Sequence, residues 1–223
     1  MWKVKVFTLY PELFPGPLNS GLYKRALDKK IWSLEIINIR DYAEDKHKTV
    51  DDTPFGGGSG MIMRADVIAN SLDKNISNKN EVIIYLSPKG KKFDQIYAKK
   101  ISNKNINIIC GHFEGIDERI LETRNVEEIS IGDFVLSGGE IGAFVIIDSV
   151  VRLLPGVIGN PTSLSEESFE NYLLEYPQYT KPQKWEKKEV PKVLLTGNHK
   201  KIKDWRLKQS EDITRRRRPD LWE

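Results

Sequence analysis

The sequence predicts an α/β protein with a parallel sheet, because three short apolar segments in the middle of the chain each end in a glycine-bearing loop. The segments are rich in β-branched residues and are bounded by Gly or Pro, which is typical of buried parallel strands. They cover residues 82–86, 106–110 and 129–131, and stretches that favour helices separate them. Strand and helix therefore alternate, as in βαβ units.

The remaining elements follow from the same patterns. Residues 2–8 alternate and residues 33–39 cluster apolar side chains, so both segments predict strands. The stretch 11–30 between them predicts a helix with an irregular beginning. Residues 40–60 show no periodicity and predict a long loop. Further helices are expected at residues 64–75, 91–101, 116–123, 139–153 and 199–210, and from Ser165, whose hydroxyl would cap that helix.

Loops at the carboxyl ends of the three central strands predict a ligand site. In open parallel sheets the ligand lies beyond these strand ends. The loops cover residues 87–90, 111–115 and 132–140, and none of them carries a phosphate-binding signature. We therefore expect a pocket lined by backbone groups for a small, flat ligand. Tight turns between packed strands are the structural alternative.

A glycine-rich tract, residues 56–60, lies at the end of the long loop. A P-loop would need Lys followed by Ser or Thr after the last glycine, but Met61 and Ile62 follow. A dinucleotide fingerprint would need a strand directly before the tract, whereas Asp-Asp-Thr-Pro precedes it. The tract is predicted to be a lid that lets a large substrate approach, with a plain mobile loop as the alternative.

Cysteine, histidine and apolar content exclude several classes of protein. Cys110 is the one cysteine, so no disulfide framework exists, and its place at the end of an apolar segment predicts a core residue. The three histidines are far apart and offer no zinc-ligand spacing. We see neither a secretory leader nor an apolar stretch long enough to span a membrane, so we expect a cytoplasmic protein without membrane contact.

Positive charge is concentrated near the C-terminus. Residues 181–223 carry 14 Lys and Arg against 7 Asp and Glu, whereas residues 1–180 carry 21 against 25. This asymmetry predicts a domain that binds a polyanion, with a solvated helical surface as the alternative. Two details favour nucleic acid: the run Arg215-Arg216-Arg217-Arg218, and the tryptophans interleaved with basic residues, which are Trp185, Trp205 and Trp222.

Six segments, in order and with matching spacing, closely resemble the bacterial tRNA (guanine-N1)-methyltransferase family that acts at position 37 of tRNA. They are TVDDTPFGGGSGM (49–61), YLSPKG (85–90), CGHFEGIDERI (110–120), SIGDFVLSGGE (130–140), DSVVRLLPGVIG (148–159) and NHKKIKDWRLKQS (198–210). The resemblance implies a SPOUT-like fold, in which a parallel sheet carries a trefoil knot, followed by a small helical C-terminal domain. It also implies an obligate homodimer, S-adenosylmethionine as methyl donor, and tRNA as substrate.

The resemblance divides the chain into three parts. Residues 1–159 would form the knotted catalytic domain that binds S-adenosylmethionine. Residues 160–172, in a turn-rich stretch, would form an interdomain linker, and residues 173–223 a basic helical domain that binds tRNA.

Donor-binding residues are carried over from the matching motifs. Backbone groups of the three loops would hold the adenine and ribose, and glycines suit such close approach. Glu114 matches a family glutamate near the carboxylate tail of the donor and is connected with magnesium dependence, so it is the candidate Mg²⁺ ligand. The predicted donor-binding residues are Tyr85, Leu86, Ser87, Pro88, Gly111, Phe113, Glu114, Ile131, Gly132, Asp133, Phe134, Val135, Leu136, Gly138 and Gly139.

The chemistry requires a general base, because guanine N1 carries a hydrogen that must leave before N1 attacks a methyl group. The family has an aspartate for this purpose just before Ser-Phe in the linker. The matching residue here is Glu167, with the adjacent Glu166 as a competitor. Either glutamate would also suit a helix N-terminus. Arg152 matches the family arginine that faces the guanine and would stabilise charge on O6, or alternatively a helix C-terminus.

RNA contacts complete the predicted site. Asp51 and Gly60 match lid residues near the target guanine, and the basic residues Arg206, Arg215, Arg216, Arg217 and Arg218 are the predicted contacts of the C-terminal domain. The predicted function is methyl transfer from S-adenosylmethionine to N1 of guanine 37 of tRNA. Two alternatives are an RNA-binding sensor of the donor without catalysis, which only the change to glutamate at 167 supports, and a knotted methyltransferase of ribosomal RNA.

Overall fold

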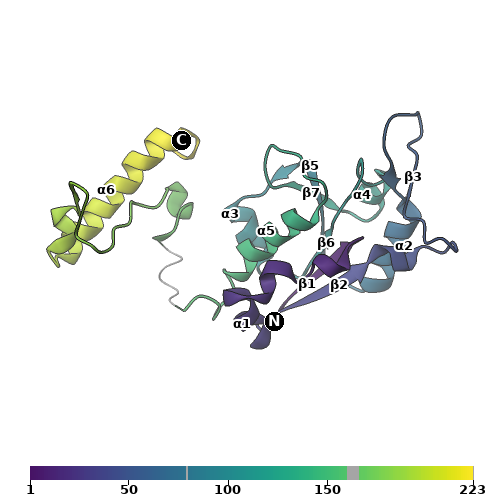
Figure 1. Ribbon diagram of the computed structural model, residues 1–223, viewed down its shortest axis with the longest axis horizontal. Coiled ribbons are helices and arrows are strands. Elements are labelled where there is room, and N and C mark those ends of the chain that lie inside the picture. The colour runs from purple at the N-terminus through teal and green to yellow at the C-terminus, as the bar shows by residue number, and fades with distance from the viewer. Residues whose placement is uncertain (79, 160–165, 223) are drawn as a thin grey trace. The chain divides into compact units, whose positions relative to one another are not determined.

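The computed structural model describes residues 1–78, 80–159 and 166–222 (Figure 1). The chain divides into two compact units, Met1–Gly159 and Asn160–Glu223. The first residues of the predicted linker, 160–165, lie outside the described residues, and with them Ser165 as the expected helix cap. The helix expected to follow Ser165 is wrong for the described residues, because residues 166–172 contain no α-helix and form a 3₁₀ helix at Glu170–Tyr172.

The described residues of the first unit form a five-stranded sheet in the order β2-β1-β6-β5-β7. Every neighbouring pair is parallel, with Val4 opposite Ile106 and Ile84 opposite Ile108. The predicted α/β class with a parallel sheet is therefore confirmed. The strands are β1 (Trp2–Thr8), β2 (Trp32–Asn38), β5 (Val82–Lys92), β6 (Ile106–Ile109) and β7 (Glu127–Ser130).

Helices cover both faces of this sheet. Because side chains alternate along a strand, β1 directs Val4 and Val6 into a core shared with α1, α3 and α5, and Phe7 into a second core with α2 and α4. Figure 1 shows α3 and α5 on one side of the strands and α2 on the other. Burial on both faces explains why the two central strands are mostly apolar, β6 throughout except Asn107 and β5 in its first five residues. The helices are α1 (Gly21–Asp28), α2 (Ala65–Asn75), α3 (Gln95–Ile101), α4 (Arg119–Thr123) and α5 (Glu140–Val151).

Strand β5 is longer than predicted. Its pairing with β7 breaks after Leu86, opposite Ile129, and resumes at Lys91, opposite the same residue. Residues 87–90 therefore bulge out of the ladder, which is the irregularity that the Ser-Pro-Lys-Gly sequence signals. The next helix begins at Gln95 and not at residue 91, because the Asp94 side chain caps it by accepting a hydrogen bond from the amide of Tyr97 (2.7 Å).

The segment 40–60 is more ordered than predicted. A 3₁₀ helix covers Ile39–Tyr42, and β3 (Asp51–Asp52) pairs antiparallel with β4 (Ile62–Met63). The loop prediction is therefore wrong at residues 51–52. The partner strand lies beyond the glycine tract, and local periodicity does not reveal a pairing of this kind.

The second unit contains one long helix, α6 (His199–Arg217), which extends seven residues beyond its predicted end. Its N-cap is Asn198, whose side chain accepts a hydrogen bond from the amide of Lys201 (3.1 Å). Three arginines occupy its last turn, where the helix dipole favours cations. The other elements are a hairpin of β8 (Lys184–Trp185) and β9 (Lys188–Glu189), and 3₁₀ helices at Glu170–Tyr172, Lys192–Leu195 and Pro219–Leu221.

Neither unit, in its described parts, contains a helix with the length and apolar character that crossing a bilayer requires.

Gly90 provides a test of the β5–β7 packing. A Cβ added at this position would lie 2.4 Å from both the carbonyl carbon of Glu128 and the amide nitrogen of Ile129. These are backbone atoms of the ladder and cannot rotate away. We expect Gly90→Ala to lower the free energy of unfolding by about 1–3 kcal/mol, measured by denaturant unfolding.

Gly159→Ala is the matched control for this substitution. Its Cβ would meet no atom within 4 Å, so we expect a change smaller than ~0.5 kcal/mol. Equal effects of the two substitutions would contradict the packing argument.

Candidate active site

The bulge of β5 at residues 87–90 and the loops after β6 and β7 enclose a cavity of about 370 Å³. This volume is in the range of small-molecule sites. Of the predicted donor-binding residues, Asp133 alone is not among those that line the cavity. The structure brings together Tyr85, Leu86, Ser87, Pro88, Gly111, Phe113, Glu114, Ile131, Gly132, Phe134, Val135, Leu136, Gly138 and Gly139.

Gly139 lies against the backbone of the neighbouring loop. Its amide donates a hydrogen bond to the carbonyl of Gly111 (3.0 Å), and an added Cβ would lie 2.6 Å from Cα of Cys110. Cys110 is fully buried, as predicted, and burial raises the pKa of its thiol well above the usual value. The glycine at this position is therefore required for packing, whatever ligand the cavity holds.

A buried carboxylate, which the sequence analysis missed, joins the parts of the cavity wall. Glu140 is 4% exposed at the start of α5, and it accepts a hydrogen bond from the Thr8 hydroxyl (2.6 Å). Both carboxylate oxygens also lie 2.9 Å from Nε2 of His112, which lines the cavity. The carboxylate thus connects the end of β1, the loop after β6 and the first turn of α5. Buried carboxylates require such partners.

Glu128 supplies an acceptor to the same cavity wall. It belongs to β7 and lines the cavity, and its Oε1 is buried without a hydrogen-bond partner among the described residues. A buried acceptor left unpaired is destabilising. A ligand that donates a hydrogen bond would therefore fit this wall.

The segment that follows the glycine-rich tract, residues 61–63, is joined to the loop after β6. The amide of Met63 donates to the carbonyl of Gly115 (2.9 Å), and the amide of Glu114 donates to the carbonyl of Met61 (3.0 Å). Gly60 lies beside Glu114, because an added Cβ would be 2.5 Å from Cγ of that glutamate. The end of the glycine-rich tract is therefore in direct contact with the cavity rim.

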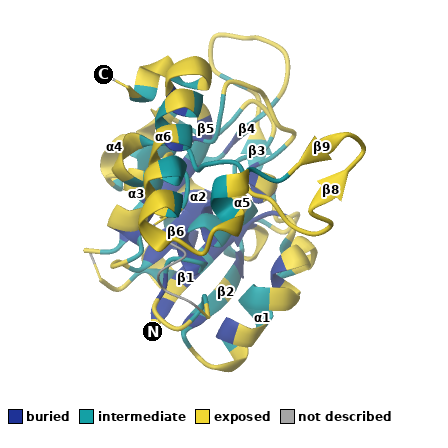
Figure 2. Ribbon diagram, turned by 90° about the vertical axis from the view of Figure 1, so that its left-hand side faces the viewer, coloured by how far each residue is buried: buried dark blue, intermediate teal, exposed yellow. Residues whose placement is uncertain are grey.

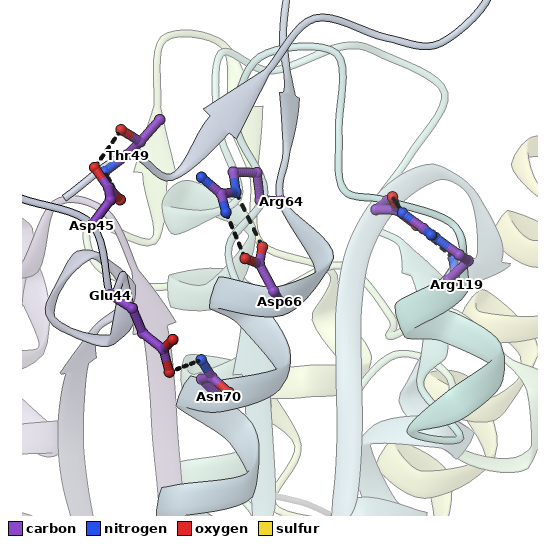
Figure 3. Close-up of polar contacts among 8 residues, drawn as sticks. Glu44, Asp45, Thr49, Arg64, Asp66, Asn70 and Arg119 are labelled. Atoms are coloured by element: carbon purple, nitrogen blue, oxygen red, sulfur yellow. Dashed lines mark hydrogen bonds and ion pairs between the residues drawn. The ribbon is translucent and has the colours of Figure 1, made fainter. Parts of the chain in front are cut away.

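The predicted lid residue Asp51 lies in the β3–β4 strand pair, opposite Met63. Figure 3 shows polar contacts of residues that come before this strand pair in the sequence, such as Asp45, and of residues that come after it, such as Arg64. Asp45 accepts hydrogen bonds from the amide (2.9 Å) and the hydroxyl (2.8 Å) of Thr49, and this hydroxyl lowers the pKa of Asp45. Arg64 donates to both oxygens of Asp66 (3.1 and 2.6 Å) and lowers the pKa of that carboxyl. These carboxylates remain ionised at neutral pH and hold the segments before β3 and after β4.

Arg152 lies far from the cavity of its own chain. It directly follows α5, whose first turn adjoins Gly139. Gly142 is the last residue of this helix that lines the cavity, and at 1.5 Å per residue the ten residues from Gly142 to Arg152 span about 15 Å. Near that end of the helix, the Tyr23 hydroxyl donates to Asp148 (2.5 Å), which raises the pKa of Tyr23 to about 12. The structure does not bring the predicted catalytic arginine to the cavity.

In the second unit, Glu166 takes part in an ion pair. Its carboxylate accepts a hydrogen bond from the Tyr176 hydroxyl (2.7 Å) and lies 3.4 Å from Nη1 of Arg206. The Arg206 guanidinium also stacks over the Tyr176 ring, 4.6 Å from its centroid. Glu166 and Glu167 both line a groove of about 550 Å³ within this unit. Glu166 and Arg206 therefore stabilise the unit itself.

The arginine run is not uniform. Arg215 lies over the Trp222 ring, 4.2 Å from its centroid. Arg218 lies 5.9 Å from the centroid of the Phe169 ring and donates to both carboxylate oxygens of Asp220 (2.8 and 2.6 Å), which neutralises much of its charge. Arg216 and Arg217 are exposed in the last turn of α6.

Within the described ranges, no group of three or more His, Cys, Asp or Glu side chains is placed to hold a metal ion. Glu114 contributes a single carboxylate beside Gly60. Magnesium binding at Glu114 therefore stays a prediction, and we derive no chemical step through a metal.

A parallel sheet covered on both faces, with a glycine-rich cavity at its carboxyl edge, defines an α/β protein that binds a small polar ligand there. Residues 2–223 match the tRNA (guanine-1)-methyltransferase family, TrmD, and the chain belongs to this family. It is therefore an enzyme of methyl transfer, as the sequence motifs predicted. Membership favours catalysis over the non-catalytic sensor.

Curated relatives agree with the family match. The chain is 68% identical over 224 residues to the tRNA (guanine-N(1)-)-methyltransferase of Pelagibacter ubique (strain HTCC1062), covering 100% of this chain and 98% of that protein. Proteins of the same name from Wolbachia pipientis wMel and Bartonella tribocorum (strain CIP 105476 / IBS 506) are each 54% identical. Both alignments cover 99% of this chain and 95% of the relative.

The Glu140 contacts generate a stability prediction. We expect Glu140→Ala to lower the free energy of unfolding by about 1–3 kcal/mol, because the Thr8 hydroxyl and the His112 ring lose a buried acceptor. Glu140→Gln retains a carbonyl oxygen at the same place and should recover much of the loss. Denaturant unfolding of the two variants measures the difference. If Gln is as destabilising as Ala, hydrogen bonding to the carboxylate is not what holds the cavity wall.

Proposed function

We propose that the chain transfers a methyl group from S-adenosylmethionine to N1 of guanine 37 of tRNA, in the cytoplasm where tRNA is modified. The observation that carries this proposal is the cavity at the strand ends, since three motifs shared with the methyltransferase family build it together. The match of the whole chain to that family supports tRNA over ribosomal RNA as the substrate.

The cavity supports S-adenosylmethionine as its ligand. Backbone groups of Gly111 and of residues 131–136 offer donors and acceptors to a purine and its ribose. The unpaired Oε1 of Glu128 would accept a hydrogen bond from a donor group of the ligand. When bound there, the ligand supplies a methyl group that is activated because it is bonded to a positively charged sulfur.

The chain's own residues supply the proton chemistry. We propose that Glu167 accepts the proton from N1 and that Arg152 stabilises the negative charge that spreads to O6. The surroundings of Glu166 support this assignment, because one oxygen of its carboxylate is already engaged by the Tyr176 hydroxyl and the Arg206 guanidinium.

We propose that two copies of the chain form the active site together. Since Arg152 lies about 15 Å along α5 from Gly142 in the cavity wall of its own chain, a second copy is the source that we propose for the arginine at the cavity. Exposed apolar side chains beside the cavity support this homodimer: Ile141 (58%), Val145 (41%) and Val135 (84%). Ile141 and Val145 are four residues apart and share one face of α5. Apolar patches of this kind mark interaction surfaces.

We also propose that the chain is threaded as a trefoil knot in the catalytic domain, residues 1–159. Two close backbone passes support it. Gly90 lies against the backbone of β7, and Gly139, in the loop after β7, lies against Cys110. At both places the two chain segments are packed without space for a Cβ.

Binding of tRNA is assigned to the C-terminal domain, residues 173–223, after a linker at residues 160–172. The excess of positive charge from residue 181 onward supports this assignment. Within the arginine run, Arg216 and Arg217 are exposed and are better placed for phosphate than Arg218, which is bound to Asp220.

Substitution of Glu167 tests the assignment of the base. We expect Glu167→Gln to lower kcat about 10²–10⁴-fold, because an amide cannot accept the N1 proton. The measurement is labelled methyl transfer to an unmodified tRNA transcript with guanine at position 37, beside S-adenosylmethionine affinity by calorimetry, which should not change. Glu167→Asp should retain activity.

Glu166→Gln is the matched control and should cause a much smaller loss of turnover. Near-normal turnover of Glu167→Gln, or an equal loss in both variants, would place the base elsewhere. A transcript with adenine at position 37 tests the methylated base separately.

Mixed dimers test the shared active site. We expect Arg152→Gln chains and Gly139→Ala chains to be weakly active alone and to regain activity when mixed, because one site of each heterodimer then has an intact cavity and an intact arginine. Methyl transfer after unfolding and co-refolding measures the gain. Activity that never exceeds the average of the two separate variants would show that each chain works alone.

A further inference from the structure

The second unit contains three tryptophans, and two of them contact another ring or a cation. Trp205 packs against the Tyr179 ring, with centroids 6.3 Å apart. Trp222 lies under the Arg215 guanidinium. Trp185 differs from both: it is 64% exposed, and no ring or cation contacts it within the described part of the chain. Figure 2 shows the whole β8–β9 hairpin as exposed.

The hairpin holds Trp185 in a defined position. Its two-residue turn, Glu186 and Lys187, has positive φ at both residues (48° and 42°). This is the feature of a type I′ turn, whose twist matches that of the paired strands. The amide of Val190 donates to the carbonyl of Gln183 (3.0 Å) and extends the pairing. The indole is therefore presented on an ordered ribbon.

The two faces of this ribbon carry different charge. Residues directly opposite in an antiparallel pair project on the same face, and the pairs here are Trp185 with Lys188 and Lys184 with Glu189. Nζ of Lys184 lies 3.7 Å from the Glu189 carboxylate, so this face is largely neutral. The other face combines an exposed indole with a cation.

An aromatic ring beside a cation matches the chemistry of an unpaired nucleotide. Bases of any sequence stack on exposed aromatic side chains, and lysines neutralise the adjoining phosphates. The same unit carries twice as many basic as acidic residues from residue 181 onward, 14 against 7, which attracts a polyanion to this part of the protein.

We propose that residues 183–190 form an RNA contact, in which Trp185 stacks on an unpaired base of the tRNA and Lys188 binds a neighbouring phosphate. The contact rests on the proposed binding of tRNA by the second unit. It adds to that proposal a site outside α6 that recognises a base surface and not only charge.

The experiment measures affinity of the full-length protein for unmodified tRNA transcript over a series of salt concentrations. Trp185→Ala should weaken binding roughly 5- to 150-fold at every salt concentration, without changing the slope against salt, because stacking releases no counterions. Trp185→Phe should bind nearly as well as the parent. Lys188→Ala should reduce the slope by about 0.7–0.9, the value for one lost phosphate contact.

Lys184→Ala is the matched control, because it removes the same charge from the face on which Lys184 pairs with Glu189. The slope of its tRNA affinity against salt should stay close to that of the parent. Calorimetry with S-adenosylmethionine should give the same affinity for all variants. Quenching of tryptophan fluorescence by tRNA should be larger in the parent than in Trp185→Phe.

Three results would overturn the contact. The first is an affinity of Trp185→Ala for tRNA equal to that of the parent, while the parent binds tRNA normally. The second is an equal loss of tRNA affinity in Trp185→Ala and Trp185→Phe. The third is unchanged tRNA binding with loss of the dimer, which would assign the indole to a second copy. Failure of the parent protein to bind tRNA would overturn the proposed function of the unit as well.

Discussion

The buried carboxylate of Glu140 is the interaction on which the cavity depends. Its side chain connects three segments that are remote in sequence: the end of β1, the loop after β6 and the start of α5. A buried carboxylate is stable only when its lone pairs are occupied, and Thr8 and His112 occupy them. Once α5 is fixed there, Gly139 is held against Cys110, and the backbone edges that face the cavity are fixed with it.

Local sequence patterns were sufficient for the sheet. The central strands β5 and β6 are buried on both faces and are therefore mostly apolar where they pair, which predicted parallel strands, whereas β1 was predicted from its alternation. The position of the cavity followed from that arrangement, because loops after parallel strands share one edge. The predicted boundaries of two elements were wrong. Helix α3 begins later than predicted, because the Asp94 side chain caps it, and β5 ends later than predicted, because its pairing resumes after the bulge at residues 87–90 and continues to Lys92.

Contacts between distant residues could not be predicted in this way. The partners of Glu140 lie 28 and 132 residues away, and a Gly-Gly-Glu sequence at a helix start gives no sign of them. The β3–β4 pair closes across a glycine tract, and the β8–β9 turn uses Glu and Lys where Asn and Gly are the usual signal. The motif resemblance predicted Arg152 as a catalytic residue. Its distance from the cavity follows from the length of α5, which the motif does not give.

The proposed homodimer places a functional constraint on the length of α5. In the proposed homodimer this helix carries part of one active site at its first turn and the arginine of the other at its end. One inserted residue would shift Arg152 by about 1.5 Å along the axis and turn it by roughly 100°, so that the two sites of a dimer would lose their alignment together. Exposed residues of α5 can therefore change in evolution far more freely than the number of residues between Gly139 and Arg152.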